Sequence, residues 1–223
     1  MRRIKPTPCL IDGSCLRSLQ DRKRAAREYF LKKEGGNSLR KYLMMAVLLA
    51  GCAVQPGEPR GGLLEVYRDT SVPISSKAVF DPARYLGTWY EVARYPVPFE
   101  AGCVGVTAEY GALADGRISV RNTCRNPDGS VRSVIDGTAE VVGPGRLKVS
   151  FPSVPFGAAD YWVLWTDETY RTAVVGAPDG RSGWILNRDP AIPADRLNAA
   201  RGMLAFNGYD LDRLLVCGPS VCR

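Results

Sequence analysis

The sequence predicts an all-β fold, an eight-stranded antiparallel up-and-down β-barrel with one C-terminal α-helix packed outside. Two observations carry this prediction. From Gly87 onward apolar and polar residues alternate with a period of two, and turn-forming residues recur about every ten positions. This pattern is typical of an antiparallel sandwich or barrel. Eight such strands can close on themselves, which removes the sheet edges and leaves an interior wide enough for one small ligand.

The opening strand is expected at 87–95, and the next two strands form a hairpin about the turn Asp115-Gly116. Apolar residues alternate with polar or small residues on both sides of this turn. If the alternation is regular, one face of each strand lines the barrel interior. The residues on that face are Val106, Ala108, Tyr110, Ile118, Val120 and Asn122.

The remaining strands lie between turns rich in glycine, proline and aspartate. They are expected at 131–142, 146–151, 160–166, 171–176 and 183–188. By the same alternation Ala139, Val149, Phe151 and Val163 face inward. This lining is mostly apolar and suits an acyl chain whose head group stays near the mouth. Alternation alone is equally consistent with a core that these side chains fill.

One stretch is expected to be helical, at 194–206. Apolar residues recur there at spacings of three and four, as on a helix that covers a core. The stripe consists of Leu197, Ala200, Met203 and Leu204. Asn207-Gly208 supplies the stop, and a short final strand is expected within 211–216.

The N-terminal part differs sharply in charge from the rest of the chain. Residues 1–51 carry twelve Lys or Arg against four Asp or Glu, whereas residues 52–223 carry eighteen against nineteen. The basic character of the chain therefore belongs to its N-terminal part. Because the remainder has no excess of cations to neutralise phosphates, we expect no nucleic acid partner.

A lipoprotein signal-peptide core is expected at 40–51. Two basic residues precede an apolar run that is too short to span a bilayer as a helix. The run ends in Leu49-Ala50-Gly51-Cys52, which resembles the bacterial lipobox. The resemblance implies that Cys52 becomes the acylated N-terminus, and Ala53 after it favours the outer membrane. We assign 1–39 to an over-extended start or a basic n-region, 52–79 to the lipidated N-terminus and a linker, and 80–223 to the folded domain.

Three short motifs resemble the signatures of the lipocalin family. The first is Gly87-x-Trp89 on the opening strand, the second is Thr166-Asp167-x-x-Tyr170 between the sixth and seventh strands, and the third ends in Arg188. The match extends over about 80–216 and is most similar to the bacterial, apolipoprotein D-like branch. It implies structural roles for these residues, with the Arg188 guanidinium lying across the Trp89 indole and closing the barrel.

The chain contains no histidine, which excludes Ser-His-Asp catalysis and His-ligated zinc or haem. We expect no cofactor and no metal. Four of the seven cysteines lie in the predicted domain and suit structural disulfides of an exported chain. One pairing joins Cys103 to Cys124, which requires a bulge or irregular register because their facings differ, and Cys217 to Cys222. The alternative, Cys103 with Cys222 and Cys124 with Cys217, resembles a tail-to-barrel bridge of the family.

The resemblance implies a non-enzymatic lipoprotein that binds a fatty acid or a lysophospholipid in the barrel. Its role would be lipid storage or transport at the periplasmic face of the outer membrane. One alternative is a tethered interaction protein with a filled barrel. A second is a lipid isomerase that uses Cys103 or Cys124 as a free thiolate, for which the chain offers few activating groups. A homodimer is compatible with the sequence.

Overall fold

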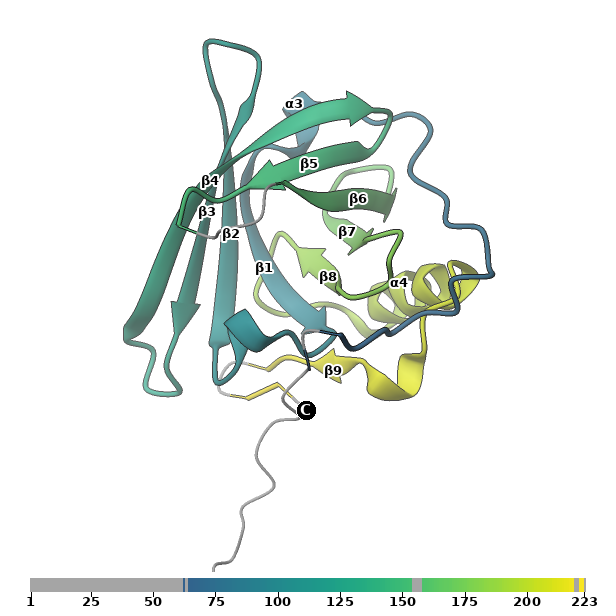
Figure 1. Ribbon diagram of the computed structural model, residues 1–223. Helices are drawn as coiled ribbons and strands as arrows, with labels where there is room; N and C mark the ends of the chain where they lie inside the picture. The colour runs from purple at the N-terminus through teal and green to yellow at the C-terminus, as the bar shows by residue number, and fades with distance from the viewer. Residues whose placement is uncertain (1–61, 63, 154–157, 219–220, 223) are drawn as a thin grey trace, which may run out of the picture. The chain divides into compact units, whose positions relative to one another are not determined.

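The computed structural model describes residues 62, 64–153, 158–218 and 221–222. In this part of the chain eight antiparallel strands close into a β-barrel (Figure 1). The strand order is β2-β3-β4-β5-β6-β7-β8-β1-β9, and a further pairing of β2 with β1 closes the ring. The predicted fold class is confirmed. Residues 1–61, with the proposed signal peptide and Cys52, lie outside the described residues.

The barrel strands agree with the predicted positions to within a few residues. They are β1 (Gly87–Arg94), β2 (Val104–Ala112), β3 (Ile118–Arg125), β4 (Val131–Gly143), β5 (Arg146–Ser150), β6 (Ala159–Thr166), β7 (Thr172–Gly176) and β8 (Gly183–Asn187). No helix in these described ranges has both the length and the hydropathy needed to cross a bilayer.

Two local elements differ from the sequence prediction. Residues 211–213, expected to begin a strand, form the 3-10 helix η3 (Leu211–Arg213), and only β9 (Leu215–Val216) is a strand. The reason is local, because the Asp210 carboxylate accepts the backbone N–H of Asp212 and favours a turn. A short helix, α3 (Pro82–Tyr85), was not expected. It is capped in the same way by Asp81 and begins with a proline.

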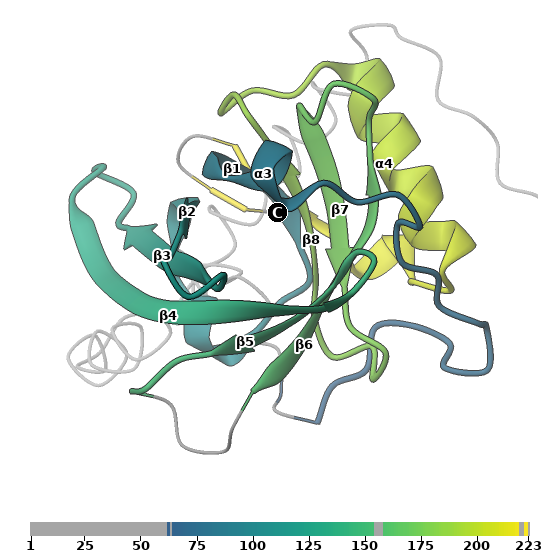
Figure 2. The ribbon, with the colours of Figure 1, turned by 90° about the horizontal axis from the view of Figure 1, so that it is seen from above.

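The predicted helix is confirmed as α4 (Ala194–Phe206), which lies outside the ring of strands (Figure 2). Ala200 and Leu204 of its apolar stripe are fully buried. They pack with Val174 of β7 and Ile185 of β8 in a core between the helix and the barrel wall. The barrel therefore has two apolar layers, one inside the ring and one beneath α4.

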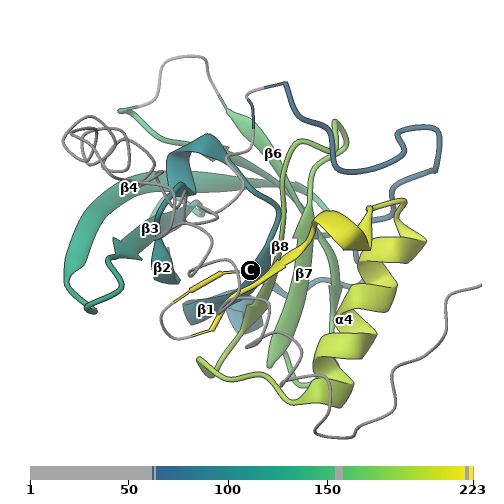
Figure 3. The same cartoon turned by 90° about the horizontal axis from the view of Figure 1, so that it is seen from below.

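The two ends of the barrel are built differently. At the closed end α3 leads into β1, and short turns join β2 to β3, β4 to β5 and β6 to β7. At the other end, which we call the mouth, lie the β1–β2 loop with the 3-10 helix η2 (Pro98–Glu100), the β3–β4 turn and the β7–β8 turn. Figure 3 looks at the mouth, where the yellow C-terminal strand β9 pairs with β1.

The C-terminal segment lies there because β1 pairs with β2 over only half of its length. Residues 87–90 of β1 pair with residues 107–110 of β2. The second half of β1 pairs with β8 on one edge and with β9 on the other. Near the mouth the β1 edge that would face β2 is thus taken by the chain's own C-terminal end.

The closed end is held by Arg188, whose guanidinium lies 3.8 Å from the centre of the Trp89 indole. Such a cation–π contact contributes about 0.5 to 2 kcal/mol. The same guanidinium donates hydrogen bonds of 2.8 to 3.3 Å to the carbonyls of Thr88, Leu86, Arg84 and Tyr170. Gly87 is needed here, because its φ is +93° and a Cβ would lie 3.3 Å from the Arg188 Nη1. One side chain thus joins three segments of the closed end.

The turn between β6 and β7 supports this arrangement. The Asp167 carboxylate accepts the backbone N–H groups of Thr169, Arg171 and Thr172. Tyr170, at a φ of 57°, accepts the N–H of Asp81 with its hydroxyl and lies beneath the Arg84 guanidinium. Thr166 is buried at the end of β6. The turn therefore fixes α3 against the barrel.

Residues 64–79, which we assigned to the linker, lie against the outside of the barrel. Tyr67 is buried, its N–H donates to the Gly180 carbonyl at 2.7 Å, and its hydroxyl donates to the Pro96 carbonyl. Arg68 donates to the Pro178 carbonyl at 2.8 Å. The chain thus joins the barrel beside the mouth and then runs to α3 at the closed end.

We expect Arg188→Met to lower the free energy of unfolding by about 2 to 4 kcal/mol, because it removes the cation–π contact and leaves four carbonyls without their donor. Urea unfolding measures the change. Arg171→Met is the matched control, since it breaks only the exposed pair with Asp189 and should change stability by less than about 1 kcal/mol. Equal losses in both variants would contradict the role of Arg188.

Candidate functional site

The inside of the barrel is the candidate site, and its lining is mostly apolar. The buried residues of this interior cluster are Tyr85, Trp89, Tyr110, Ile118, Val120, Ala139, Leu147, Val149, Val163, Tyr170, Ala173, Val175 and Leu186. Ala108, Phe151, Tyr161 and Trp184 are among the partly buried residues that pack against it.

Eight of the ten residues predicted to face inward belong to the interior cluster or pack against it. Val106 does not, because it packs with Cys103 and Cys124 in a separate cluster beside the mouth. Asn122 pairs with Ala108 across the β2–β3 ladder and has a buried Oδ1.

Three tyrosine hydroxyls meet inside the barrel. The Tyr161 hydroxyl lies 2.8 Å from that of Tyr85 and 2.9 Å from that of Tyr110. The Trp184 ring is stacked beside the Tyr161 ring, with the two centres 6.4 Å apart. These side chains come from α3, β2, β6 and β8, so the closed barrel alone brings them together.

The three hydroxyls leave one proton for a ligand. They carry three protons, and the two hydrogen bonds among them use two. Asn122 adds an acceptor, since its buried Oδ1 accepts no hydrogen bond from the described residues. Asn122 and Tyr110 occupy diagonal positions on the neighbouring strands β3 and β2, and residues at such positions are about 7 to 8 Å apart. The interior thus offers one donor and one acceptor in an apolar surrounding.

The three hydroxyls remain protonated at physiological pH. Burial raises the pKa of Tyr110 to about 12 and raises the pKa values of Tyr85 and Tyr161 well above their usual range. The polar group inside the barrel is therefore neutral, and it suits an uncharged part of a ligand better than an ionised one.

We expect the free energy of unfolding to fall as the pH rises from about 10 towards about 12. In this window an unfolded Tyr110 loses a proton that the folded chain retains, because its pKa is 10.0 when exposed and about 12 in the barrel. As the pH rises, the free energy of unfolding falls wherever the folded state binds more protons than the unfolded state. Urea unfolding across this range should show a shallower fall for Tyr110→Phe. An identical fall would contradict the assignment.

Charged side chains gather nearer the mouth. The guanidinium of Arg94, which is 1% exposed, lies 2.9 Å from the Glu91 carboxylate and donates at 3.1 Å to the Cys103 carbonyl. The Trp184 indole N–H donates at 3.2 Å to the Glu100 carboxylate. A ligand that enters the barrel passes this charged region before it reaches the tyrosines.

Two disulfides lie at the same end, Cys103–Cys124 and Cys217–Cys222. The structure thus contains the first of the two pairings considered. The register of β2 and β3 shifts between Val104 and Thr107, where Gly105 has a φ of +55°. This bulge turns the Cys103 side chain towards Cys124, as the difference in facing required. All four cysteines are in disulfides, so none of them carries a free thiol.

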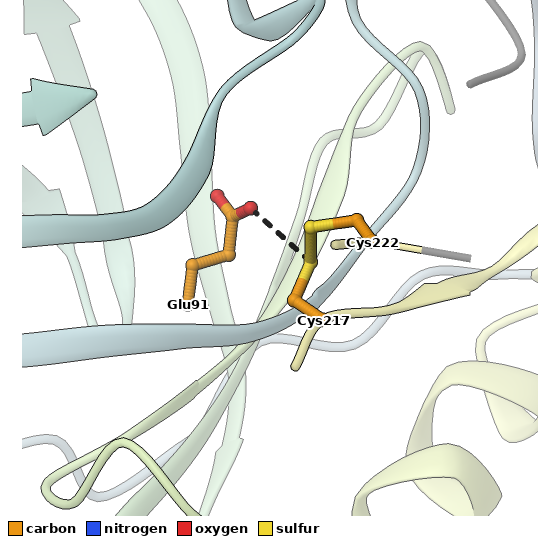
Figure 4. A group of neighbouring side chains, drawn as sticks. All are labelled: Glu91, Cys217 and Cys222. Atoms are coloured by element: carbon orange, nitrogen blue, oxygen red, sulfur yellow. Dashed lines mark hydrogen bonds between the residues drawn. A yellow bond between two sulfur atoms is a disulfide. The ribbon is translucent and has the colours of Figure 1, made fainter. Parts of the chain in front are cut away.

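Glu91, Cys217 and Cys222 form a buried group that resembles a metal site in its spacing (Figure 4). The Glu91 Oε1 lies 3.7 Å from the Cys217 Sγ. The two sulfurs are bonded to each other, so neither is a thiolate that could bind a metal, and the carboxylate already pairs with Arg94. The C-terminal segment is held beside β1 by backbone pairing of β9 and by the Cys217 N–H, which donates to the Val92 carbonyl at 2.9 Å.

Residues of β1, β2, β3 and β4 border a depression of about 400 Å³. Its lining includes Glu109, Arg121 and Asp136, which neighbour one another across the strands and are exposed. Arg121 and Asp136 form a surface ion pair at 3.3 Å. Tyr110 and Val120 of the interior cluster also border this depression.

Sequence reasoning missed several residues of the interior, among them four of its apolar lining, Leu147, Ala173, Val175 and Leu186. Tyr161 and Trp184 have the facing of Val163 and Leu186, and Glu91 that of Trp89, so alternation could have found all three. Arg94 could not be found in this way, because a register shift between Glu91 and Ala93 changes the facing of the strand. Tyr85 precedes the first strand and carried no signal.

The comparisons with known proteins agree with this geometry. A family profile described as a lipocalin-like domain matches residues 80–218. The chain is 38% identical over 139 residues to outer membrane lipoprotein Blc of Citrobacter freundii, covering 61% of this chain and 77% of that protein. It is 31% identical over 194 residues to apolipoprotein D of Macaca fascicularis, covering 81% and 97%. The solved structure of insecticyanin from Manduca sexta aligns with a TM-score of 0.54 at 20% identity, covering 65% and 84%.

Proposed function

The chain belongs to the family of lipocalin-like domains, and we propose that it binds one fatty acid or lysophospholipid inside the barrel as a lipid carrier of the cell envelope. The observation that carries the proposal is the interior itself, an apolar lining whose neutral polar groups are the three tyrosine hydroxyls and the Asn122 amide. Ligand pockets of this kind bind the apolar body by burial and orient it with a few polar groups.

The charges of the site indicate how such a ligand lies. An ionised carboxylate or phosphate loses much hydration free energy when it is buried without a cation, and the groups beside Tyr110 and Asn122 are neutral. The head group therefore stays near the mouth, where Arg94, Glu100 and Trp184 lie. The acyl chain extends towards Trp89 at the closed end.

Catalysis by a barrel thiol has less support. An isomerase of that type needs Cys103 or Cys124 as a free thiolate, and the two are joined in a disulfide. The interaction protein with a filled barrel remains the competing function, and ligand titration separates it from the carrier.

The first test is a titration of the mature chain with a fatty acid and with a lysophospholipid, followed by tryptophan emission. We expect saturable one-to-one binding with a Kd on the order of micromolar or tighter. Trp184→Phe should reduce the spectral change, because Trp184 borders the interior, and the remaining change should come from Trp89 inside the barrel. Trp162→Phe should retain it, because Trp162 packs with the outer core and lies against Arg146.

No spectral change in the wild-type chain, together with no displacement of a bound apolar dye, would contradict the carrier and favour the filled barrel. A change that depends on Trp162 and not on Trp184 would indicate a ligand on the outside of the barrel.

We also propose that Cys52 carries the lipid that anchors the protein to the periplasmic face of the outer membrane. The proposal is supported by the lipobox Leu49-Ala50-Gly51-Cys52 and by relatives named outer membrane lipoprotein. We expect labelled palmitate to be incorporated into the wild-type chain and not into Cys52→Ala, with Cys9→Ala as the control. Equal labelling of all three would overturn the assignment.

A further inference from the structure

Four of the exposed large apolar side chains of the described residues lie at the mouth, whereas Val79, Val141 and Val142 are exposed at the closed end. Phe99 is 72% exposed on η2, Val131 is 58% exposed at the start of β4, and Leu64 is 79% exposed where the described chain begins. Val221, beside the C-terminal disulfide, is 47% exposed. We call these four residues the mouth rim. Large apolar side chains that surround one opening are typical of a surface that binds a partner or a membrane.

The chain that precedes the barrel joins it at the same end. Tyr67 is held to the β7–β8 turn by the Gly180 carbonyl and to the β1–β2 loop by the Pro96 carbonyl. Residues 52 to 64 span at most about 40 Å when fully extended. An anchor at Cys52 therefore keeps the rim within reach of the bilayer that holds the anchor.

The charges near the rim do not favour a purely electrostatic partner. Arg213 pairs with Glu65, and Arg181 lies 3.9 Å from Asp179. The Arg132 guanidinium donates to the Gly102 carbonyl of the β1–β2 loop. Since cations and acids alternate at this end, association through the rim should depend on burial of apolar side chains and only weakly on salt.

We propose that the mouth rim docks on the surface of a lipid bilayer, with Phe99, Val131 and Leu64 inserted at the boundary between head groups and acyl chains. Docked in this way, the open end of the barrel faces the membrane, and an acyl lipid passes between bilayer and barrel without crossing water. The inference rests on the proposed function for its ligand and its anchor, but the docking contact has its own readout.

The direct test uses the full lipidated chain in vesicles of phosphatidylethanolamine and phosphatidylglycerol whose acyl chains are brominated. Bromine quenches tryptophan only at close contact. We expect Phe99→Trp to lose several-fold more of its added emission than Val142→Trp, its matched control, which adds a tryptophan at an exposed valine of the closed end. Equal quenching of the two variants, or quenching of Val142→Trp alone, would overturn the proposal.

A second test measures transfer of a fluorescent lysophospholipid from the same vesicles. Phe99→Asp with Val131→Asp should slow transfer about tenfold, because carboxylates are poorly tolerated at the acyl boundary. Val79→Asp with Val142→Asp should transfer at the wild-type rate, and added salt should change none of these rates strongly. Equal rates for both double variants would count against docking through the rim.

The two proposals fail in different ways. If the barrel binds no lipid, an apolar dye in solution binds to no variant, while the quenching of Phe99→Trp still reports docking. If docking is wrong, the dye binds to every variant with the same Kd and quenching does not distinguish the two ends.

Discussion

Closure of the barrel is the constraint on which the rest of the structure depends. A sheet of eight strands has two edges, and here they meet only where Gly87–Tyr90 of β1 pair with residues 107–110 of β2. This short pairing is reinforced at the closed end, where Arg188 covers Trp89 and donates to carbonyls of the segment that leads into β1 and of the β6–β7 turn. Without closure the inward faces would not surround a common space, and the tyrosine hydroxyls would not meet.

The same short pairing explains the mouth. Where β1 leaves β2, its free edge pairs with β9, and the C-terminal disulfide lies beside Glu91. Arg94 links this region to the β1–β2 loop through the Glu91 carboxylate and the Cys103 carbonyl. Inside the barrel, the charged groups Arg94, Glu91 and Glu100 therefore lie near the mouth, and the neutral tyrosine hydroxyls lie nearer the closed end. This gradient of polarity matches an amphiphile that enters with its acyl chain first.

Much of the fold could be predicted because the pattern is local. Alternation places residues on one face or the other of a strand, and eight of the ten residues that it placed inside the barrel belong to the interior cluster or pack against it. It failed where the backbone departs from regular pleating. The shift between Glu91 and Ala93 changes the facing of Arg94, and the bulge at Gly105 moves Val106 to the disulfide. Such irregularities cannot be predicted from the sequence of one strand, because they depend on how that strand pairs with its neighbours.

The sequence by itself determined the strands, the helix and the absence of histidine, because each depends on residue type or on local spacing. The roles of Trp89 and Arg188 in closing the barrel were expected only from the resemblance to the lipocalin family. Only the tertiary structure decided which side chains share the interior. Tyr85, Tyr110 and Tyr161 are far apart in the chain, and no pattern relates their positions. Their hydroxyls meet because closure brings α3, β2 and β6 around one axis, and distances across a barrel follow from strand order and register rather than from spacing along the chain.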